Sequence, residues 1–271
     1  MGVAMKFSLV DNERREAEPK LSGICPFCKA KTIAKCGEIL SWHWAHYRKH
    51  DCDHWWENEQ EWHRNWKNKF PNDWQEVIHR SEDGEKHIAD IKTDHSWAIE
   101  FQHSYLDPKE RRSRELFYKR MVWVVDGLRR KNDLKQFTEA IQDHGILISE
   151  RPRIHSVFPD FCRLIKEWLP SDVPVFFDFG EQLEANSLWL LIPMGSDKNP
   201  CVTPIDKNTF IDWHLKGNFT PQPIMNSVRE LKREMEFKQS ASGHFPVSSY
   251  RLNPRPHYEQ QRLKRKPRRR F

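Results

Sequence analysis

No run of about 18 apolar residues occurs in the 271-residue sequence, so no segment has the length of a membrane-spanning helix. The opening segment, MGVAMKFSLVDNERR, has too short an apolar stretch for a secretory signal and lacks a cleavage motif. MGVAMK also lacks the Ser or Thr expected at the end of a myristoylation signal. No internal repeat is present. We therefore expect a cytoplasmic protein that makes no membrane contact.

The six cysteines do not have the distribution of a disulfide framework. Four of them lie within the first 52 residues, and the other two stand alone much later in the chain. In a cytosolic protein this clustering indicates metal binding before disulfide formation.

The formal charge of +6 is spread unevenly over the chain. Residues 237–271 contain ten Lys or Arg and one Glu, a balance of +9, which leaves about −3 for the rest. Such composition is typical of a disordered tail that attracts polyanions, although a merely solubilising tail has the same composition. The candidate nucleic-acid contacts in this tail are Arg265, Lys266, Arg268, Arg269 and Arg270.

The hydrophobic content of 37% is enough for real cores, and its pattern indicates α/β organisation. An apolar stripe that ends before Pro71 predicts a helix: Trp55, Trp62, Trp66 and Phe70. Beside it runs a polar stripe, Glu59, His63 and Lys67. A period of two then predicts a β meander in EVIHR, HIADIKT and WAIEFQ. Further helices are expected in DPKERRSRELFYKR, LKQFTEAIQDHG, DFCRLIKEWLP and KNTFIDWHLKG, and further strands in MVWVVDG, VPVFFDFG and SLWLLIP.

We divide the chain into four parts. Residues 1–56 form an N-terminal module, residues 57–150 a core, residues 151–236 a C-terminal α/β region, and residues 237–271 the basic tail. The α/β region could be a separate small domain or an extension of the same sheet.

The N-terminal module has the ligand types of a structural zinc site. Cys25 and Cys28 form one pair, and His43 and His46 follow after 14 residues. Two thiolates and two imidazoles make a tetrahedral set that Zn²⁺ prefers, and a closed set of four indicates structure rather than catalysis. Other residues nearby could replace a ligand, with Cys52 first among Cys36, His50, Cys52 and His54. A core without metal is the remaining alternative.

The meander carries two carboxylates on IADIKTDHSWAIEFQHS. If the turn is the three-residue loop DHS centred on His95, residues whose numbers sum to 190 lie opposite one another. Asp90 then faces Glu100, with Cβ atoms about 4.5–5.5 Å apart. Ala89, Ile91, Thr93, Trp97, Ile99 and Phe101 would form the apolar opposite face.

Two adjacent carboxylates repel, and a divalent cation such as Mg²⁺ or Mn²⁺ would remove that penalty. A solvent-facing strand surface is the alternative explanation of the same residues. An even-numbered turn would send Asp90 and Glu100 to opposite faces.

Six segments occur in the order CPFC, HWAH, EQEWHRNWK, HIAD, AIEFQHS and RELFY. Together they resemble the competence protein CoiA family, a branch of the PD-(D/E)xK nuclease superfamily. The correspondence covers about residues 21–130, and VPVFFDFG, LWLLIP and NTFI resemble the family's C-terminal region more loosely. Trp44 and Gln60 replace the family's usual Phe and Ser, and neither touches the proposed chemistry.

The resemblance implies an α/β fold with a restriction-endonuclease-like core and a mixed central sheet, flanked by the zinc-binding module and the C-terminal α/β extension. It assigns Asp90, Glu100 and the Phe101 carbonyl to Mg²⁺, and Glu59 to a second ion or a metal-bound water. Gln102 stands at the superfamily's usual lysine position.

His63 and Lys67 fall on the family's helix motif. Lys67, Lys92 or Gln102 would orient the nucleophile. Arg114 and Tyr118 fall on a later helix motif and could clamp a phosphate. Without the resemblance, both helix motifs could equally be solvated surface pairs.

We therefore expect a DNA nuclease that requires Mg²⁺ or Mn²⁺, contains structural Zn²⁺ and hydrolyses phosphodiester bonds. It would act in DNA uptake, recombination or defence against foreign DNA, with or without other proteins of such a system. Two alternatives stay open: a non-catalytic DNA-binding adaptor with the same fold, and an RNA-binding protein that acts through the basic tail.

Overall fold

The computed structural model describes residues 4–48, 52–53, 55, 60–81, 83–195 and 199–241, and the side chains only as far as residue 238 in the last range. The chain forms two compact units, Met1–Lys232 and Arg233–Phe271. The first unit contains both sheets. The described part of the second unit is the end of helix α6 (Pro221–Ala241).

A small antiparallel sheet forms the N-terminal part, where the sequence predicted few regular segments. Its strand order is β1-β6-β5-β4-β2-β3. The strands are β1 (Ala4–Met5), β2 (Phe7–Val10), β3 (Glu13–Glu16), β4 (Ser22–Ile24), β5 (Lys31–Lys35) and β6 (His43–His46). Met5, Cys25 and Trp44 are buried on its inner face in one apolar cluster. Strands of two to five residues carry little periodic signal, which explains why the sequence did not reveal them.

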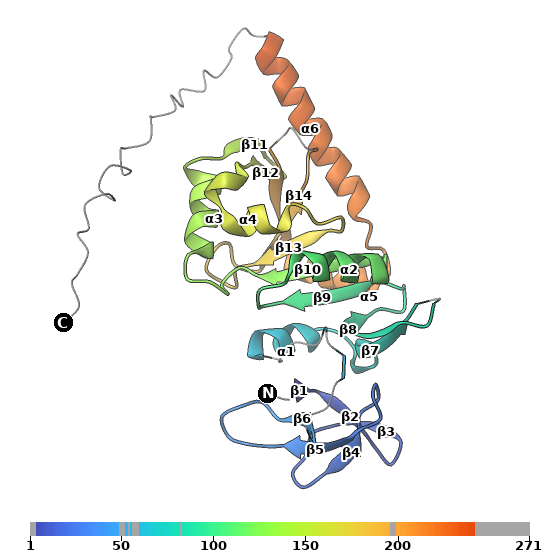
Figure 1. The fold of residues 1–271 in the computed structure, drawn as a ribbon. Coiled ribbons are helices and arrows are strands. Elements are labelled where there is room, and N and C mark those ends of the chain that lie inside the picture. Colours follow the sequence, from blue (N-terminus) through green and yellow to red (C-terminus); the bar gives the residue numbers. More distant parts are fainter. Residues whose placement is uncertain are drawn as a thin grey trace, which may run out of the picture. The chain divides into compact units, whose positions relative to one another are not determined.

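A nine-stranded mixed sheet forms the rest of this unit, in the order β11-β12-β15-β14-β13-β10-β9-β8-β7 (Figure 1). Its first strands are β7 (Gln75–Arg80), β8 (Lys86–Lys92), β9 (Ala98–Gln102) and β10 (Met121–Asp126). The others are β11 (Ile146–Glu150), β12 (Arg153–Ser156), β13 (Val175–Asp178), β14 (Ser187–Ile192) and β15 (Cys201–Asp206). The C-terminal strands thus continue the same sheet, because β13 pairs in parallel with β10.

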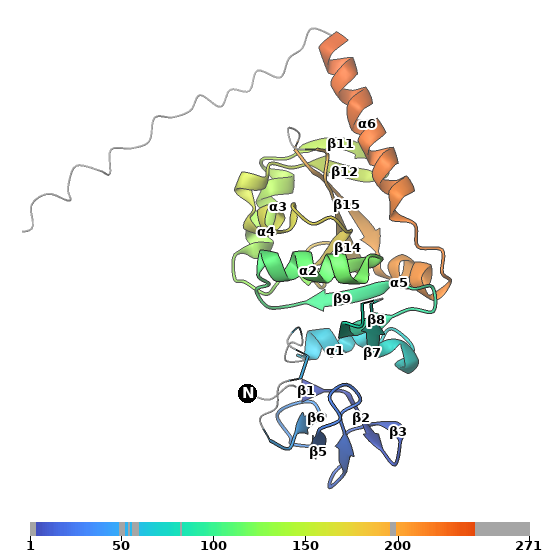
Figure 2. The same ribbon diagram turned by 45° about the vertical axis from the view of Figure 1, so that its right-hand side comes forward.

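Helices cover both faces of the large sheet. The elements on one face, seen from the side in Figure 2, are α2 (Pro108–Tyr118), α3 (Asp133–Gln142) and α4 (Arg163–Trp168). The other face carries α1 (Glu61–Lys67), α5 (Lys207–Leu215) and the beginning of α6. Within the described ranges, no helix is both long and apolar enough to cross a bilayer.

Helix α2 connects two parallel strands and places its residues beside β9. Pro108 stands in its first turn, and the Asp107 side chain caps it by accepting a hydrogen bond from the Lys109 N–H at 2.8 Å. β9 and β10 then pair in parallel, with Glu100 opposite Trp123. The connection therefore puts α2 directly over the face to which Glu100 belongs.

Helix α1 is shorter than the apolar stripe predicted. It begins at Glu61, so Trp55 lies outside it. Trp55 packs with Phe117 and Tyr118 on the α2 face, whereas Trp66 packs on the opposite face of the sheet. The assignment of Trp55 to the helix stripe is therefore wrong, because a spacing of seven residues fits a helix only when the backbone between them is helical throughout.

His214 of α5 is buried in an aromatic cage on the second face. Its ring stacks on Phe219 with centroids 4.3 Å apart, and Phe70 and Phe210 close the cage. Burial lowers the pKa of His214 to about 4. Its Nε2 atom has no hydrogen-bond partner among the described residues, which favours the neutral ring.

We predict that His214→Phe flattens the acid limb of the stability profile. Above the unfolded-state pKa of about 6.5 the neutral ring costs nothing, but as the pH falls the unfolded chain binds a proton that folded His214 does not. From pH 7 to pH 5 the wild type should lose about 2 kcal/mol more unfolding free energy than the variant. Urea denaturation at both pH values measures this, and equal losses in the two proteins would contradict it.

Candidate metal centre and carboxylate site

Three cysteines and one histidine converge in the N-terminal part. The ligand atoms of Cys25, Cys28, His46 and Cys52 all lie within 4.8 Å of one another. Cys25 and Cys28 come from the turn between β4 and β5, which is tightened by the Lys29 N–H donating to the Cys25 carbonyl at 3.0 Å. The cluster could therefore hold a structural metal such as zinc.

The spacing within the cluster fits a tetrahedral ion. Cys28 Sγ lies 3.1 Å from His46 Nε2, and Cys25 Sγ lies 3.9 Å from Cys52 Sγ. Tetrahedral Zn–S bonds of about 2.3 Å place two sulfurs about 3.8 Å apart. Hydrogen bonding with Cys52 lowers the pKa of the Cys25 thiol despite its burial, and the same pairing raises the pKa of Cys52. Within the pair, the thiolate form is therefore favoured at Cys25.

Cys52 takes the place that the sequence analysis gave to His43. β6 contains both His43 and His46, and residues three apart in a strand point to opposite faces. His43 Nδ1 instead lies 2.9 Å from the Ser41 carbonyl oxygen, outside the cluster. The choice of His43 as ligand is therefore corrected to Cys52, the substitute held open above. Cys36 packs beside the apolar cluster without joining the metal ligands, and His50 and His54 lie outside the described residues.

The β8–β9 hairpin has the predicted register. Ile91 pairs with Ile99 and Lys92 with Ala98, so the paired numbers sum to 190. The loop DHS is closed by the Thr93 N–H, which donates to the Trp97 carbonyl at 2.9 Å. Ser96 adopts φ +66°, the left-handed residue that a three-residue hairpin loop uses. The odd-numbered turn is confirmed, and with it the approach of Asp90 to Glu100.

Where β8 and β9 separate, the carboxylates of Asp90 and Glu100 accept hydrogen bonds from backbone N–H groups in place of backbone carbonyls. The Phe101 N–H donates to Asp90 Oδ2 at 2.9 Å, and the Asp90 N–H donates to Glu100 Oε1 at 3.3 Å. Ala89 packs on the α2 face and Ile91 on the other, so side-chain alternation breaks at Asp90. The expectation that Ala89 and Ile91 share a face is therefore wrong. The hairpin opens at the position where the carboxylates meet.

Asp90 is held ionised by positive neighbours. His63 Nε2 of α1 lies 2.7 Å from Asp90 Oδ2. Although burial raises the pKa of Asp90, His63, Lys67 and the Phe101 N–H together bring it below its ordinary value. His63 is 6% exposed, so its α1 stripe is not the solvated surface that remained an alternative.

Glu100 carries the opposite shift. Burial and the neighbouring Asp90 charge raise the pKa of Glu100 well above its ordinary value, against the effect of Arg114. Arg114 Nη1 lies 3.4 Å from Glu100 Oε2, and its remaining nitrogens donate to Glu110 and to the Trp55 carbonyl. A buried carboxylate with a raised pKa beside one with a lowered pKa is an arrangement that a bound cation stabilises.

The two candidate lysines have different surroundings. Lys67 is fully buried, and its Nζ lies 2.7 Å from Glu76 Oε1. Lys92 is partly exposed, and its Nζ donates to the Ser96 carbonyl in the hairpin loop at 3.2 Å. Lys67 is thus the lysine whose charge acts on Asp90.

The other motif residues are buried beside this site. The amide of Gln102, which is 1% exposed, donates to the Ser104 carbonyl at 3.3 Å. Arg114 and Tyr118 are both 4% exposed, so they are not the surface pair that remained an alternative. Burial and the charge of Glu100 raise the pKa of Tyr118 well above its ordinary value. Glu59 and the basic residues 265–270 lie outside the described residues.

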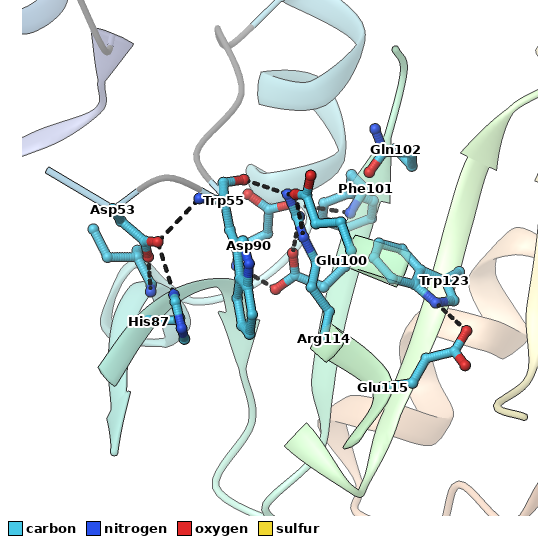
Figure 3. A network of polar contacts seen from close by, with 12 residues as sticks. Asp53, Trp55, His87, Asp90, Glu100, Phe101, Gln102, Arg114, Glu115 and Trp123 are labelled. Atoms are coloured by element: carbon cyan, nitrogen blue, oxygen red, sulfur yellow. Dashed lines mark hydrogen bonds and ion pairs between the residues drawn. The ribbon is translucent and has the colours of Figure 1, made fainter. Parts of the chain in front are cut away.

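Asp53 connects the cysteine cluster to the carboxylate site, and Figure 3 shows its contacts with Trp55 and His87. It follows Cys52 directly, and its carboxylate accepts hydrogen bonds from the Ile88 N–H at 2.7 Å and the Trp55 N–H at 3.1 Å. His87 Nδ1 lies 2.8 Å from the same carboxylate, and the His87 ring stacks on Trp55. Because the Trp55 carbonyl accepts from Arg114, the segment after Cys52 reaches the partner of Glu100.

Sequence reasoning missed Asp53 and a second buried carboxylate, Glu76. Glu76 accepts from the Lys6 N–H at 2.9 Å and from the Phe7 N–H at 3.2 Å, and it pairs with Lys67. It ties the small sheet to α1 and β7. Neither acid stands in a recognisable motif, so only the fold reveals these contacts, although Asp53 directly follows the candidate ligand Cys52 in the sequence.

Comparison with known proteins gives one family match. Residues 11–54 match the family described as Competence protein CoiA, N-terminal domain, and this range includes all four cluster residues. No curated protein and no solved structure matches the chain significantly.

We predict that the purified protein holds one zinc ion per chain and that Cys52→Ala loses it. His43→Ala is the matched control and should keep the ion, because its ring points away from the cluster. Elemental analysis of the purified variants measures the content. Retention by Cys52→Ala together with loss by His43→Ala would reverse the ligand assignment.

We also predict that Asp53→Asn lowers the unfolding free energy by about 3 kcal/mol, because it leaves Nδ1 of buried His87 without its buried anionic partner. Glu85→Gln removes the other acid beside His87. Because the Glu85 side chain is 52% exposed, this variant should lose less than about 1 kcal/mol of unfolding free energy. Denaturant melts of the zinc-loaded variants make the comparison. Similar losses in the two variants would argue against the role of Asp53.

Proposed function

Because the chain is CoiA-like in its N-terminal domain, we propose that it is a metal-dependent nuclease that hydrolyses phosphodiester bonds in DNA. The single observation that carries this proposal is the meeting of the half-buried carboxylate of Asp90 with the buried carboxylate of Glu100, where the β8–β9 hairpin opens. A restriction-endonuclease-like core, with the β7–β9 meander and the parallel strand β10 at its centre, is part of the same proposal.

Mg²⁺ or Mn²⁺ fits the donor set of this site. Such ions often bind through one or two carboxylates and complete their shell with water and substrate phosphate. Asp90 and Glu100 would supply the carboxylates, with the Phe101 carbonyl beside them. When bound, the ion would activate a water molecule and neutralise the phosphate. The raised pKa of Glu100 supports this assignment, because a cation would replace the proton that burial otherwise favours.

The chain's own side chains orient the carboxylates. His63 lies against Asp90 and Arg114 against Glu100, so each acid is fixed from a different helix. Lys67 is the better candidate than Lys92 for the positive charge that Gln102 cannot supply, because Lys67 acts on Asp90 whereas Lys92 turns into the hairpin loop. Glu59 keeps its proposed role at a second ion or a metal-bound water.

The family's name supports a role in competence, that is, in DNA uptake or recombination. Defence against foreign DNA is compatible with the same chemistry. DNA is the proposed partner, and residues 237–271 would add affinity through Arg and Lys charges that weaken with salt.

One observation favours a second candidate, a non-catalytic DNA-binding adaptor. Asp90 and Glu100 are already satisfied by His63, Arg114 and backbone N–H groups, and Glu100 is only 4% exposed. An adaptor could keep this network solely to hold β8 and β9 together. It would bind DNA and leave it uncut.

We predict that Asp90→Asn and Glu100→Gln each reduce Mg²⁺- or Mn²⁺-dependent cleavage of supercoiled and linear DNA by about 100-fold or more. Loss of a direct ligand should exceed the ten- to 100-fold cost of losing an outer partner. The matched control is Asp94→Asn, which removes an exposed acid from the loop of the same hairpin and should cleave normally. Unchanged cleavage in both site variants would reject the nuclease, and DNA binding without cleavage by the wild type would favour the adaptor.

A further inference from the structure

The outer face of the small sheet exposes apolar and aromatic side chains. Trp44 and Ala34 pack inward, so their alternating neighbours point outward. We define the outer face by Ile24, Lys31, Ile33, Lys35, His43, Ala45 and Tyr47. Tyr47 extends the ladder beyond β6, because its N–H donates to the Lys31 carbonyl at 2.9 Å. Tyr47 is 57% exposed and Ile24 is 42% exposed.

Positive charge surrounds the exposed tyrosine. Lys31 Nζ lies 5.4 Å from the centre of the Tyr47 ring, and the Arg48 guanidinium lies 5.9 Å from it. Lys35 is exposed at the other end of β5, and the outer face as defined contains no carboxylate. Within the same hairpin, Trp42 is 48% exposed just before β6. Aromatic rings and cations therefore alternate along one hairpin.

We propose that this outer face binds single-stranded DNA. Unpaired bases would stack on Tyr47 of this face and on Trp42 in the adjoining hairpin loop, and the phosphates beside them would contact Lys31, Lys35 and Arg48. Aromatic platforms beside a basic track are the usual means of holding a single strand without reading its sequence. An acidic peptide would use the positive charges but would not need the flat aromatic rings. A DNA duplex would not use the rings either, because its bases are already stacked on one another.

The hairpin is attached to the helix that flanks the carboxylate site. Arg64 Nη1 of α1 donates to the Trp42 carbonyl at 2.6 Å, and the preceding residue, His63, contacts Asp90. A DNA strand bound on the outer face would therefore be held by a hairpin that is hydrogen-bonded to α1, the helix that contacts Asp90. The inference deepens the proposed function by naming single-stranded DNA as the class of substrate, but the stacking surface itself does not require cleavage.

The test measures binding of a fluorescent oligothymidine of about 20 nucleotides, longer than a typical single-strand site, by the full-length zinc-loaded protein without added Mg²⁺. Tyr47→Ala and Trp42→Ala should each weaken binding about 5- to 100-fold, the range expected for one lost base stack. Tyr47→Phe keeps the ring and should bind like the wild type. Phe161→Ala, which removes an exposed aromatic residue of another part of the chain, should also leave binding unchanged.

Three results would overturn the inference. The first is wild-type affinity for the oligothymidine in both alanine variants, and the second is a loss of duplex binding in these variants as large as their loss of single-strand binding. The third is tighter binding of the matching RNA than of the DNA by the wild type. Zinc content and melting temperature verify that each variant is folded, and ultraviolet crosslinking of Tyr47 to the oligonucleotide provides a measurement independent of affinity. The cleavage assay with Asp90→Asn is separate. Loss of binding in Tyr47→Ala together with no metal-dependent cleavage by the wild type would uphold this surface and reject the nuclease.

Discussion

The contact between Asp90 and Glu100 is the constraint on which the arrangement of the large sheet depends. Two acids in a buried place cost free energy unless cations or donors compensate them, and here the compensation comes from opposite sides. α1 brings His63 to one acid, and α2 brings Arg114 to the other. The position of both helices, and the opening of the β8–β9 hairpin between them, thus follow from two carboxyl groups.

The N-terminal part is connected to this site by two further acids. Asp53 joins the cysteine cluster to β8, and Glu76 joins the first strands to Lys67 of α1. Both acids are buried, and both accept hydrogen bonds from backbone N–H groups of a different segment. Buried contacts of this kind fix geometry more than they add stability, because much of the Coulomb gain is spent on desolvation. A metal in the cysteine cluster would therefore organise residues well beyond its own ligands.

Much of the core could be predicted from the sequence, because its signals are local. The meander and its register followed from a period of two and the odd length of the DHS loop, and α2 followed from Pro108 near its start. The four residues of the cysteine cluster were predicted only in part, because HWAH does not reveal that it is a strand in which His43 and His46 diverge. Asp53 and Glu76 could not be predicted, since their partners lie 35 and 70 residues away in the chain.

The pairing of β13 with β10 also bears on how such a chain could be divided or could have evolved. β10 is buried along its whole length, and β13 covers its outer edge with equally buried residues. A fragment that ended before β13 would expose a strand edge that is apolar from Met121 to Val125, which is a template for pairing with other chains. By covering the edge of β10, the second half of the sheet therefore prevents this strand from pairing with other chains. A shorter ancestor of this protein would have needed another way to cover β10.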